Sequence, residues 1–313
     1  MLGEQRMKNY ILEDLIESVK KQNLHVLNVV IRKDGDIIAE YDFEEEKPTL
    51  LWSVSKTFTS MGIGIAESEG YFKLNDKILD YFKDESMQIN DKFNKITIHD
   101  LLCMSTGHAR CAVERAMEEN KSLDDISKLF FEEHIVFEPG THFLYNNAAT
   151  YMLSKLISIT TGYNLKEYLM PRIFEPLEIH DPQWESDVNG ISLGLTGLYL
   201  TAHDLSKFGQ LLLNNGIWNG KQLIPADYIA QATKSQVDTY EFDKSFATED
   251  HKQGYGYQIW INSYPNSYRM DGMYGQYVVI LPDKNAVITY VSNEPSNMTD
   301  VLELTWNTIV DKL

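Results

Sequence analysis

Cysteine is scarce in this chain, and its histidines are dispersed. Only two cysteines, Cys103 and Cys111, occur among 313 residues, and one pair at that spacing is neither a disulfide framework nor a zinc-ligand set. We expect both to be reduced, partly buried thiols. The eight histidines include no His-Glu-x-x-His motif and form no cluster with cysteine. The sequence therefore predicts no metal and no other cofactor.

Long apolar runs and excess positive charge are also lacking. No apolar stretch approaches the ~20 residues that span a membrane, and the N-terminal residues carry charges where a secretory signal has an apolar core. A net charge of −18 repels nucleic-acid phosphates and anionic membrane surfaces. We therefore expect a cytoplasmic protein, or an extracytoplasmic one if a leader was removed. Its expected partner is a small-molecule substrate, and no oligomeric state is predicted.

The residues that are present predict an α+β protein. Apolar residues at helical spacing indicate a helix around residues 10–24, and two β-rich runs then flank the turn signal Asp34-Gly35. The pattern from about residue 60 to 190 is mostly helical, and within it TIHDLLCMSTGH predicts a capped helix that ends near Gly107. Residues 254–292 predict strands separated by turns, and the chain ends on a helical pattern.

These elements predict one antiparallel sheet, because three or more strands are needed for a stable sheet. We expect the N-terminal hairpin to pair with the C-terminal strands, with the terminal helices covering one face. The sheet lobe would comprise residues 1–60 and 195–313, and residues 61–194 would form an all-helical lobe. A cleft between two lobes is a common place for a small-molecule site.

The stretch at residues 50–70, LLWSVSKTFTSMGIGIAESEG, places a serine and a lysine before an apolar helix. If the helix begins at Ser53, Lys56 lies one turn later on the same face. The free N–H groups of a first helical turn favour a serine alkoxide over an ammonium, and desolvation lowers the lysine pKa further. A neutral lysine beside a serine hydroxyl is a nucleophile–base pair. Ser55 points elsewhere and is expected to be structural.

The context of this Ser-x-x-Lys motif is more specific than the motif, which also occurs at Ser18–Lys21. The segment SVSKTFTSMGIGIAESEGYFKLND resembles the active-site helix of the serine β-lactamase and penicillin-binding-protein superfamily, in particular its class C β-lactamase and esterase branch. ITIHDLLCMSTGH, FEPGTHFLYNNAATYMLSKLISITTG and GYGYQIWI resemble later segments of that branch in the same order. The resemblance covers the chain from about residue 25 and implies a β-lactamase/transpeptidase-like fold.

In that family, the tyrosine of a Tyr-x-Asn motif lies beside the serine and lysine. The resemblance maps it to Tyr145, with Asn147 two residues later; the same motif at Tyr264–Asn266 lacks the surrounding PGTHFLYNN context. It implies that Tyr145 and Lys56 together take the serine proton, and that Asn147 orients a substrate amide. We also expect a cationic neighbour to lower the tyrosine pKa. The alternative role for Tyr145 is a buried phenol with a satisfied hydroxyl.

The third family element is a strand with Lys-Thr-Gly or His-Thr-Gly, which corresponds here to Met270–Gly272. The glycine is retained and the cation is not. The resemblance places Asp271 and Gly272 beside the substrate and gives the backbone N–H of Met273 to an oxyanion hole. Backbone donors do not depend on side chains, so acyl transfer is retained, whereas recognition of a β-lactam carboxylate is weakened. Arg269 is expected to face away from the missing cation's position, because strand neighbours alternate faces.

A second serine has a competing motif. Gly190-x-Ser192-x-Gly194 matches the nucleophile elbow of α/β-hydrolases, which needs a buried strand before it and a helix after it. The preceding residues, DPQWESDVN, are polar. We therefore predict a glycine-rich turn between the lobes.

The sequence as a whole predicts a serine hydrolase that forms an acyl-enzyme at Ser53. Its substrate would be a carboxylic ester, a small amide, a D-alanyl peptide or a β-lactam, with esters and amides favoured by the missing cation. The alternative is a penicillin-binding or sensor protein that is acylated without efficient turnover. The acidic segment 235–253 would either rim the site or be an ordinary surface loop.

Overall fold

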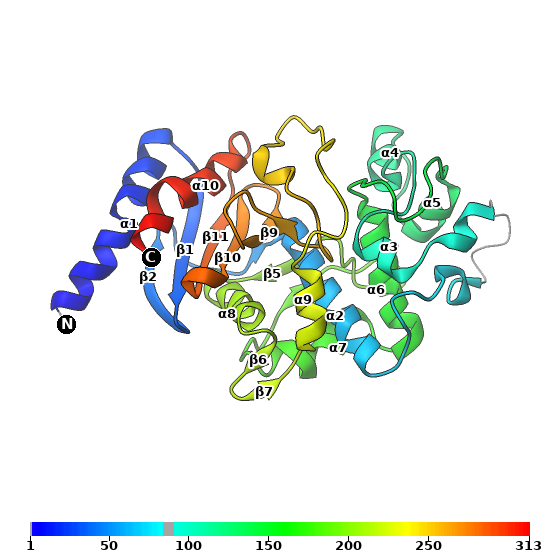
Figure 1. The fold of residues 1–313 in the computed structure, drawn as a ribbon, viewed down its shortest axis with the longest axis horizontal. Coiled ribbons are helices and arrows are strands. Elements are labelled where there is room, and N and C mark those ends of the chain that lie inside the picture. The colour runs from blue at the N-terminus through cyan, green and yellow to red at the C-terminus, as the bar shows by residue number, and fades with distance from the viewer. Residues whose placement is uncertain (1, 84–90) are drawn as a thin grey trace.

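A computed structural model describes residues 2–83 and 91–313 of the chain. Both ends of the chain contribute to one six-stranded antiparallel sheet with the order β2-β1-β11-β10-β9-β8 (Figure 1). Its strands are β1 (Val26–Lys33), β2 (Asp36–Asp42), β8 (Trp260–Ile261), β9 (Tyr268–Gly272), β10 (Gln276–Leu281) and β11 (Ala286–Ser292). This arrangement confirms the α+β fold expected from the sequence.

The β1–β2 hairpin closes at the expected turn. Asp34 and Gly35 have φ angles of 53° and 92°, the left-handed conformations of a tight two-residue hairpin turn. On its other edge β1 pairs with β11, with Ile31 opposite Ile288. The first and last strands are therefore neighbours in the sheet, which ties the two ends of the chain together.

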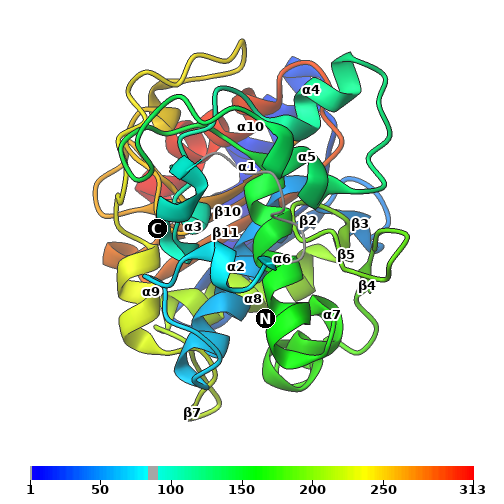
Figure 2. The same ribbon diagram turned by 90° about the vertical axis from the view of Figure 1, so that its right-hand side faces the viewer.

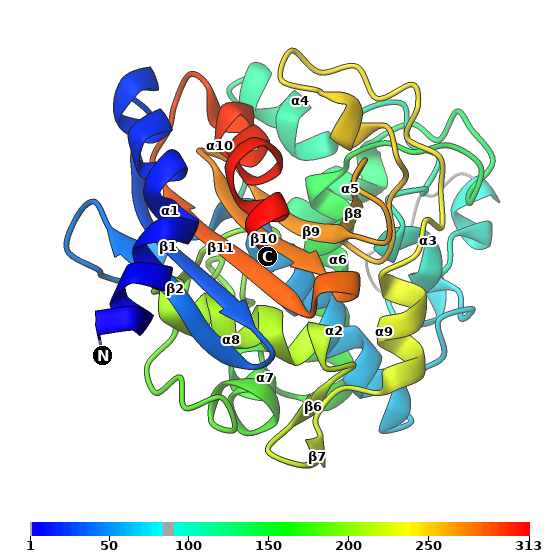
Figure 3. The same cartoon turned by 60° about the vertical axis from the view of Figure 1, so that its left-hand side comes forward.

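The terminal helices cover one face of this sheet (Figure 3). They are α1 (Leu2–Gln22) and α10 (Met298–Leu304), the latter continued by the short turns η8 (Thr305–Ile309) and η9 (Val310–Lys312). Leu12, Leu15 and Val19 of α1 are buried in an apolar cluster with β-strand residues such as Ile288. The helical spacing of these residues explains why this face of α1 is buried.

The opposite face of the sheet supports the rest of the molecule. Helix α8 (Ala202–Leu213) lies directly on the sheet, where a Cβ on Gly209 would come within 2.6 Å of Val287 and 2.7 Å of Val278. Phe208 of α8 stacks on Phe58 of α2 (Ser55–Ser68), with ring centroids 3.6 Å apart. Helix α2 is buried from Ser55 to Ala66 and is therefore the central rod of the fold.

The remaining helices lie mostly beyond α2, away from the sheet (Figures 1 and 2). They are α3 (Ile98–Leu102), α4 (Ala112–Glu118), α5 (Ile126–Glu132), α6 (Asn147–Thr161), α7 (Leu165–Leu169) and α9 (Ala226–Ala232). Short helical turns are η1 (Trp52–Val54), η2 (Ile78–Asp80), η4 (Asp91–Lys95), η5 (Met170–Phe174), η6 (Glu249–His251) and η7 (Pro282–Lys284).

Two small sheets complete the described elements. One has the order β3-β5-β4, with β3 (Thr49–Leu50), β4 (Gln183–Trp184) and β5 (Leu198–Leu200). The other pairs β6 (Ile217–Trp218) with β7 (Lys221–Gln222). Because β4 and β5 lie on opposite sides of residue 195 in the sequence, this sheet crosses the predicted lobe boundary. The division at residues 60 and 195 stays a prediction.

Two local expectations differ from the structure in detail. The helix expected to end near Gly107 begins with a Thr97 capping box but ends at Leu102. Met104 there has a φ of 55°, and its carbonyl accepts a hydrogen bond from the backbone of Leu144 at 2.9 Å, so a tertiary contact stops the helix. Both cysteines are free but fully buried, where partial burial was expected. None of the described helices is long and apolar enough to cross a membrane.

Candidate active site

Ser53 lies in the 3₁₀ turn η1, which leads directly into α2. The α-helix itself begins at Ser55, two residues later than expected. Residues i and i+3 overlie each other in a 3₁₀ turn, so Ser53 and Lys56 still share a side, and Lys56 Nζ lies 2.8 Å from Ser53 Oγ. Ser55 is buried and its hydroxyl accepts a hydrogen bond from the Leu198 backbone at 3.3 Å, as expected of a structural residue.

Lys56 is buried, and no carboxylate of the described residues pairs with it. Its side chain is 1% exposed, and Nζ donates a 2.7 Å hydrogen bond to the carbonyl of Leu195. Desolvation lowers the pKa of Lys56 to about 7. The amine is therefore substantially neutral near neutral pH and can accept a proton from the adjacent hydroxyl.

The glycine-rich segment around Ser192 serves this site through its backbone, a role that sequence reasoning missed. Ser192 is buried, and its hydroxyl accepts a hydrogen bond from the Lys166 backbone at 3.3 Å. Gly194 has a φ of 70°, and a Cβ there would lie 2.7 Å from Ser154. This close packing brings the next carbonyl, that of Leu195, to Lys56. The sequence signal that could have indicated this backbone role was two closely spaced glycines in a segment with few charged residues.

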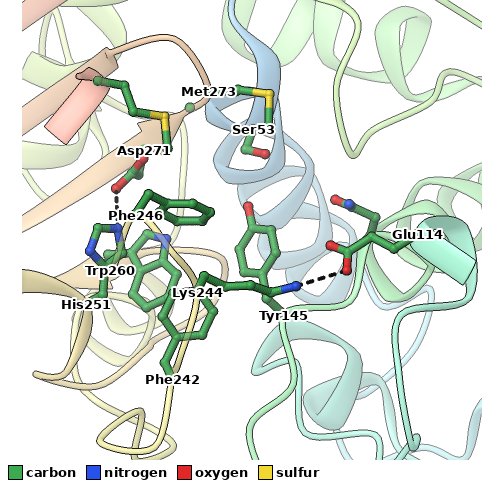
Figure 4. A pocket seen from close by; sticks show the side chains of 13 residues that line it. Ser53, Glu114, Tyr145, Phe242, Lys244, Phe246, His251, Trp260, Asp271 and Met273 are labelled. Carbon is green, nitrogen blue, oxygen red and sulfur yellow. Dashed lines mark hydrogen bonds and ion pairs between the residues drawn. The ribbon is translucent and has the colours of Figure 1, made fainter. Parts of the chain in front are cut away.

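Tyr145 completes a triangle with Ser53 and Lys56. Its hydroxyl points toward Ser53 (Figure 4), and Lys56 Nζ lies 5.1 Å from the centroid of its ring. The ring stacks on Trp260 at 5.9 Å. Burial raises the pKa of Tyr145, although the nearby Ser53 hydroxyl opposes this. The expected lowering of this pKa is therefore wrong: the neighbouring lysine is itself desolvated, and Asp271 adds negative charge.

The predicted residues meet in one pocket that encloses about 660 Å³ of empty space, part of it open to solvent. Ser53, Tyr145, Asn147, Asp271, Gly272 and Met273 line it, and Lys56 lies buried behind Ser53. Asn147 is the first residue of α6, whose N-cap is Asn146. The residues of the second Tyr-x-Asn motif do not line this pocket: Tyr264 stacks on Trp306, and Asn266 hydrogen-bonds to Asp283.

Strand β9 approaches the Ser53 turn closely because Gly272 has no side chain. A Cβ at this position would lie 2.5 Å from the carbonyl oxygen of Leu51 and 3.2 Å from Val54. The retained glycine therefore brings the end of β9, and Met273 after it, beside η1. An oxyanion hole formed by the N–H groups of Met273 and Ser53 stays a prediction.

The opposite rim comes from side chains that the sequence analysis did not name individually. Phe242, Lys244, Phe246 and His251 belong to the segment 235–253 and line the pocket. This segment therefore rims the pocket, one of the two roles considered for it. Trp260 and Met298 add apolar surface, and Glu114 of α4 joins from the far side, where Lys244 pairs with it at 3.1 Å (Figure 4).

Arg269 does not replace the missing family cation. It is fully buried behind the pocket and donates from Nε to Asp271 Oδ2 at 2.8 Å and from Nη1 to Asn262 Oδ1 at 2.9 Å. His251 Nε2 lies 3.4 Å from the same Asp271 oxygen. Burial would raise the pKa of Asp271, but the charge of Arg269 and the contact with His251 hold it below its ordinary value. Asp271 therefore lines the pocket as a carboxylate.

The fold and the pocket define a protein of the serine β-lactamase and penicillin-binding-protein type, and comparison with known proteins agrees. The model of the Beta-lactamase family matches residues 12–310. The chain therefore belongs to the β-lactamase family, a family of hydrolases, as its motifs indicated.

Individual relatives are distant. A "Beta-lactamase" of Escherichia coli K12 is 28% identical over 47% of this chain, and the match spans only 37% of that protein's own length. The "6-aminohexanoate-dimer hydrolase" of Paenarthrobacter ureafaciens is 22% identical over 85% of this chain and 72% of its own. The solved structure of "EstCE1, a hydrolase with promiscuous acyltransferase activity" has a TM-score of 0.79 at 14% identity, covering 100% of this chain and 99% of that one. At this identity the structural likeness shows the fold alone.

Proposed function

We propose that this protein is a serine hydrolase that forms an acyl-enzyme at Ser53 and acts on carboxylic esters or small amides. The observation that carries the proposal is the contact between a serine hydroxyl and a lysine amine whose pKa burial lowers to about 7, so that a substantial share of it is neutral. No surface Ser-x-x-Lys pair would have this property, because a solvated lysine stays charged. The Ser18–Lys21 motif is an example, since Lys21 is exposed on α1.

Acylation begins when Ser53 Oγ attacks the carbonyl carbon of the substrate. The hydroxyl proton passes to Lys56, 2.8 Å away, as the new C–O bond forms. The phenol of Tyr145 keeps its proton in the resting pocket because its pKa is raised. It therefore donates a hydrogen bond or a proton to the leaving group, and the proton held by Lys56 replaces it.

The negative oxygen of the tetrahedral intermediate needs donors that are already in place. The backbone N–H groups of Ser53 and Met273 fill this role in the proposal, and the close approach allowed by Gly272 supports it. Asn147 presents its amide to the substrate from the start of α6. Water then attacks the acyl-enzyme with the neutral Lys56 as the base, which releases the acid and restores Ser53.

The relatives support an ester or amide as substrate. The Paenarthrobacter ureafaciens relative is named for hydrolysis of 6-aminohexanoate dimer, and EstCE1 for hydrolase and acyltransferase activity. Met270 replaces the family's cation, and the carboxylate of the next residue, Asp271, lines the pocket. β-Lactams and D-alanyl peptides, which carry a carboxylate of their own, are therefore the weaker substrate classes in this proposal.

The test combines p-nitrophenyl butyrate, a fluorescent penicillin and intact mass spectrometry. We expect ester turnover in the wild-type protein, a transient butyryl adduct, and loss of both in Ser53→Ala. Ser192→Ala is the matched serine control and should retain turnover, because Ser192 does not line the pocket. A persistent adduct without turnover would instead support the penicillin-binding or sensor function. Activity that survives in Ser53→Ala and is lost in Ser192→Ala would overturn the assignment.

A further inference from the structure

The charged groups around the pocket are already paired with one another. Among the described residues, the pocket lining contains one lysine and no arginine. This lysine is Lys244, and it pairs with Glu114 at 3.1 Å. Arg269 lies behind the lining and is bound to Asp271 at 2.8 Å. The four charges of these two pairs sum to zero. A negatively charged substrate would therefore meet no cation that is free to receive it.

His251 does not supply the missing cation either. Its Nδ1 lies 3.2 Å from the backbone nitrogen of Thr248, which donates a hydrogen bond to it. Its Nε2 lies 3.4 Å from Asp271. Both ring nitrogens are thus engaged in joining the segment 235–253 to β9.

Asp271 is the charged group that the sheet side of the pocket offers to a substrate. Both Arg269 and His251 contact its Oδ2 atom, and Oδ1 has no recorded donor among the described residues. The side chain is 14% exposed and lines the pocket, whereas Arg269 is 0% exposed. The carboxylate therefore lies between the substrate and the cation that neutralises it.

We propose that the charge of the substrate chain decides specificity: the pocket accepts acyl groups that are neutral or carry an ammonium, which Asp271 receives, and excludes those that carry a carboxylate. This inference rests on the proposed hydrolase function. A carboxylate entering the pocket loses hydration, gains no partner and is repelled by Asp271. A cationic ammonium loses hydration as well but gains an ion pair with the carboxylate of Asp271.

The test uses three p-nitrophenyl esters of similar chain length, each corrected for its uncatalysed hydrolysis. They are the heptanoate, the 6-(trimethylammonio)hexanoate and the monoester of adipic acid. We expect kcat/KM for the adipate ester to be roughly tenfold or more below that of the heptanoate, because like charges brought together in a desolvated site repel strongly. The cationic ester should equal or exceed the neutral one. High salt should narrow the differences.

Asp271→Asn sharpens the test, because it keeps the side-chain shape and leaves the charge of Arg269 uncompensated. The variant should lose the discrimination against the adipate ester or invert it. Asp283→Asn is the matched control: it makes the same change in net charge at an exposed carboxylate paired with Asn266 and should keep the wild-type order. If Asp271→Asn does not fold, the wild-type series still decides the question.

The outcomes separate the two proposals. Ser53-dependent hydrolysis in which the adipate ester is as good a substrate as the heptanoate would overturn the charge selection and leave the hydrolase function standing. Absence of Ser53-dependent hydrolysis for all three esters would overturn the hydrolase function and the charge selection together.

Discussion

The inner end of the pocket and its outer rim treat charge in opposite ways. At the inner end, the hydrogen-bond partners of Lys56 among the described residues are uncharged oxygens, those of Ser53 and Leu195. At the rim, Lys244 is paired with Glu114, and behind the sheet side of the pocket the buried Arg269 is paired with Asp271. An amine that is desolvated without a counter-ion gives up its proton readily, whereas a paired one stays charged. The lysine without a counter-ion can therefore act as a base, whereas the paired cations stay charged and contribute only to the shape and charge of the pocket.

The comparison explains why a costly feature persists at the inner end. Burying an amine without a partner is unfavourable, and the lowered pKa of Lys56 reflects this cost. A paired lysine at the same place would stabilise the fold more and would hold its proton too tightly to act as a base. The packed helix α2, buried from Ser55 to Ala66, provides the stability that the lysine reduces.

Lys56→Met should have the largest effect, because it removes the base and keeps the volume of the side chain. We expect kcat/KM for p-nitrophenyl butyrate to fall by about 10²–10⁴, the usual contribution of a general base. The melting temperature should stay the same or rise, since an apolar chain avoids the desolvation cost. Ester assays and thermal unfolding followed by circular dichroism measure both. A folded variant with near wild-type turnover would show that isolation of the amine has no catalytic purpose.

The pH dependence tests the same contrast in the unmodified protein. Lys56 must be neutral to accept the proton, so kcat/KM should rise with pH through its pKa of about 7 and then level off. An unfolded lysine titrates near its ordinary value of 10.5, so between these two values the unfolded chain binds more protons. The stability of the folded protein should therefore rise with pH across this window. Lys56→Met should lack that part of the rise in stability. A kcat/KM of the wild-type protein that does not change with pH around neutrality would contradict the role of Lys56 as the base.

Gly272→Ala should have an intermediate effect at the boundary between the two regions. The new Cβ would lie 2.5 Å from the Leu51 carbonyl and would push β9 away from the Ser53 turn. We expect kcat to fall by roughly 10- to 100-fold, because small misplacements of catalytic groups are costly. Steady-state kinetics with p-nitrophenyl butyrate measures this.

Gly62→Ala is the control for this substitution. Its Cβ would meet only the ends of the Leu165 and Leu169 side chains, at 3.0 Å and 3.4 Å, which can shift. Activity should therefore stay close to that of the wild type. Equal losses in both variants would indicate that general packing, and not the approach of β9 to Ser53, determines the rate.

The inner end was largely predictable from the sequence, and the rim was not. Ser53 and Lys56 lie three residues apart, so local geometry alone places them together, and a family resemblance located Tyr145. Glu114, Lys244 and Trp260 come from three separate segments, and their meeting depends on tertiary packing. The predicted direction of the Tyr145 pKa shift was wrong for the same reason. Burial against Trp260 and the nearby charge of Asp271 cannot be inferred from a Tyr-x-Asn motif.

The fold shows a similar limit. The β1–β2 hairpin was predictable because its turn residues determine it, and α6 ends at Gly162 in the left-handed conformation that a terminal glycine favours. The early end of α3 was not predictable, since it depends on Leu144 reaching the carbonyl of Met104 from another part of the chain. Local signals thus set the elements, while distant contacts set where some of them end.

Lys244→Met should have the smallest effect. It tests whether the rim affects substrate binding alone, and not the chemical step. Lys244 and Glu114 are both exposed, at 43% and 40%, and such pairs contribute about 0.2–1 kcal/mol. We expect KM for p-nitrophenyl butyrate to rise by roughly two- to fivefold, since that energy converts to a small affinity change, with kcat unchanged.

Lys252→Met is the matched control, because Lys252 pairs with Glu249 at 2.9 Å in the same segment and does not line the pocket. It should leave both constants unchanged. High salt should weaken the exposed Lys244–Glu114 pair and so reduce the difference between Lys244→Met and the wild type. If Lys244→Met instead lowered kcat tenfold at constant KM, the rim would take part in the chemical step, and the contrast between a reactive inner end and a passive rim would fail.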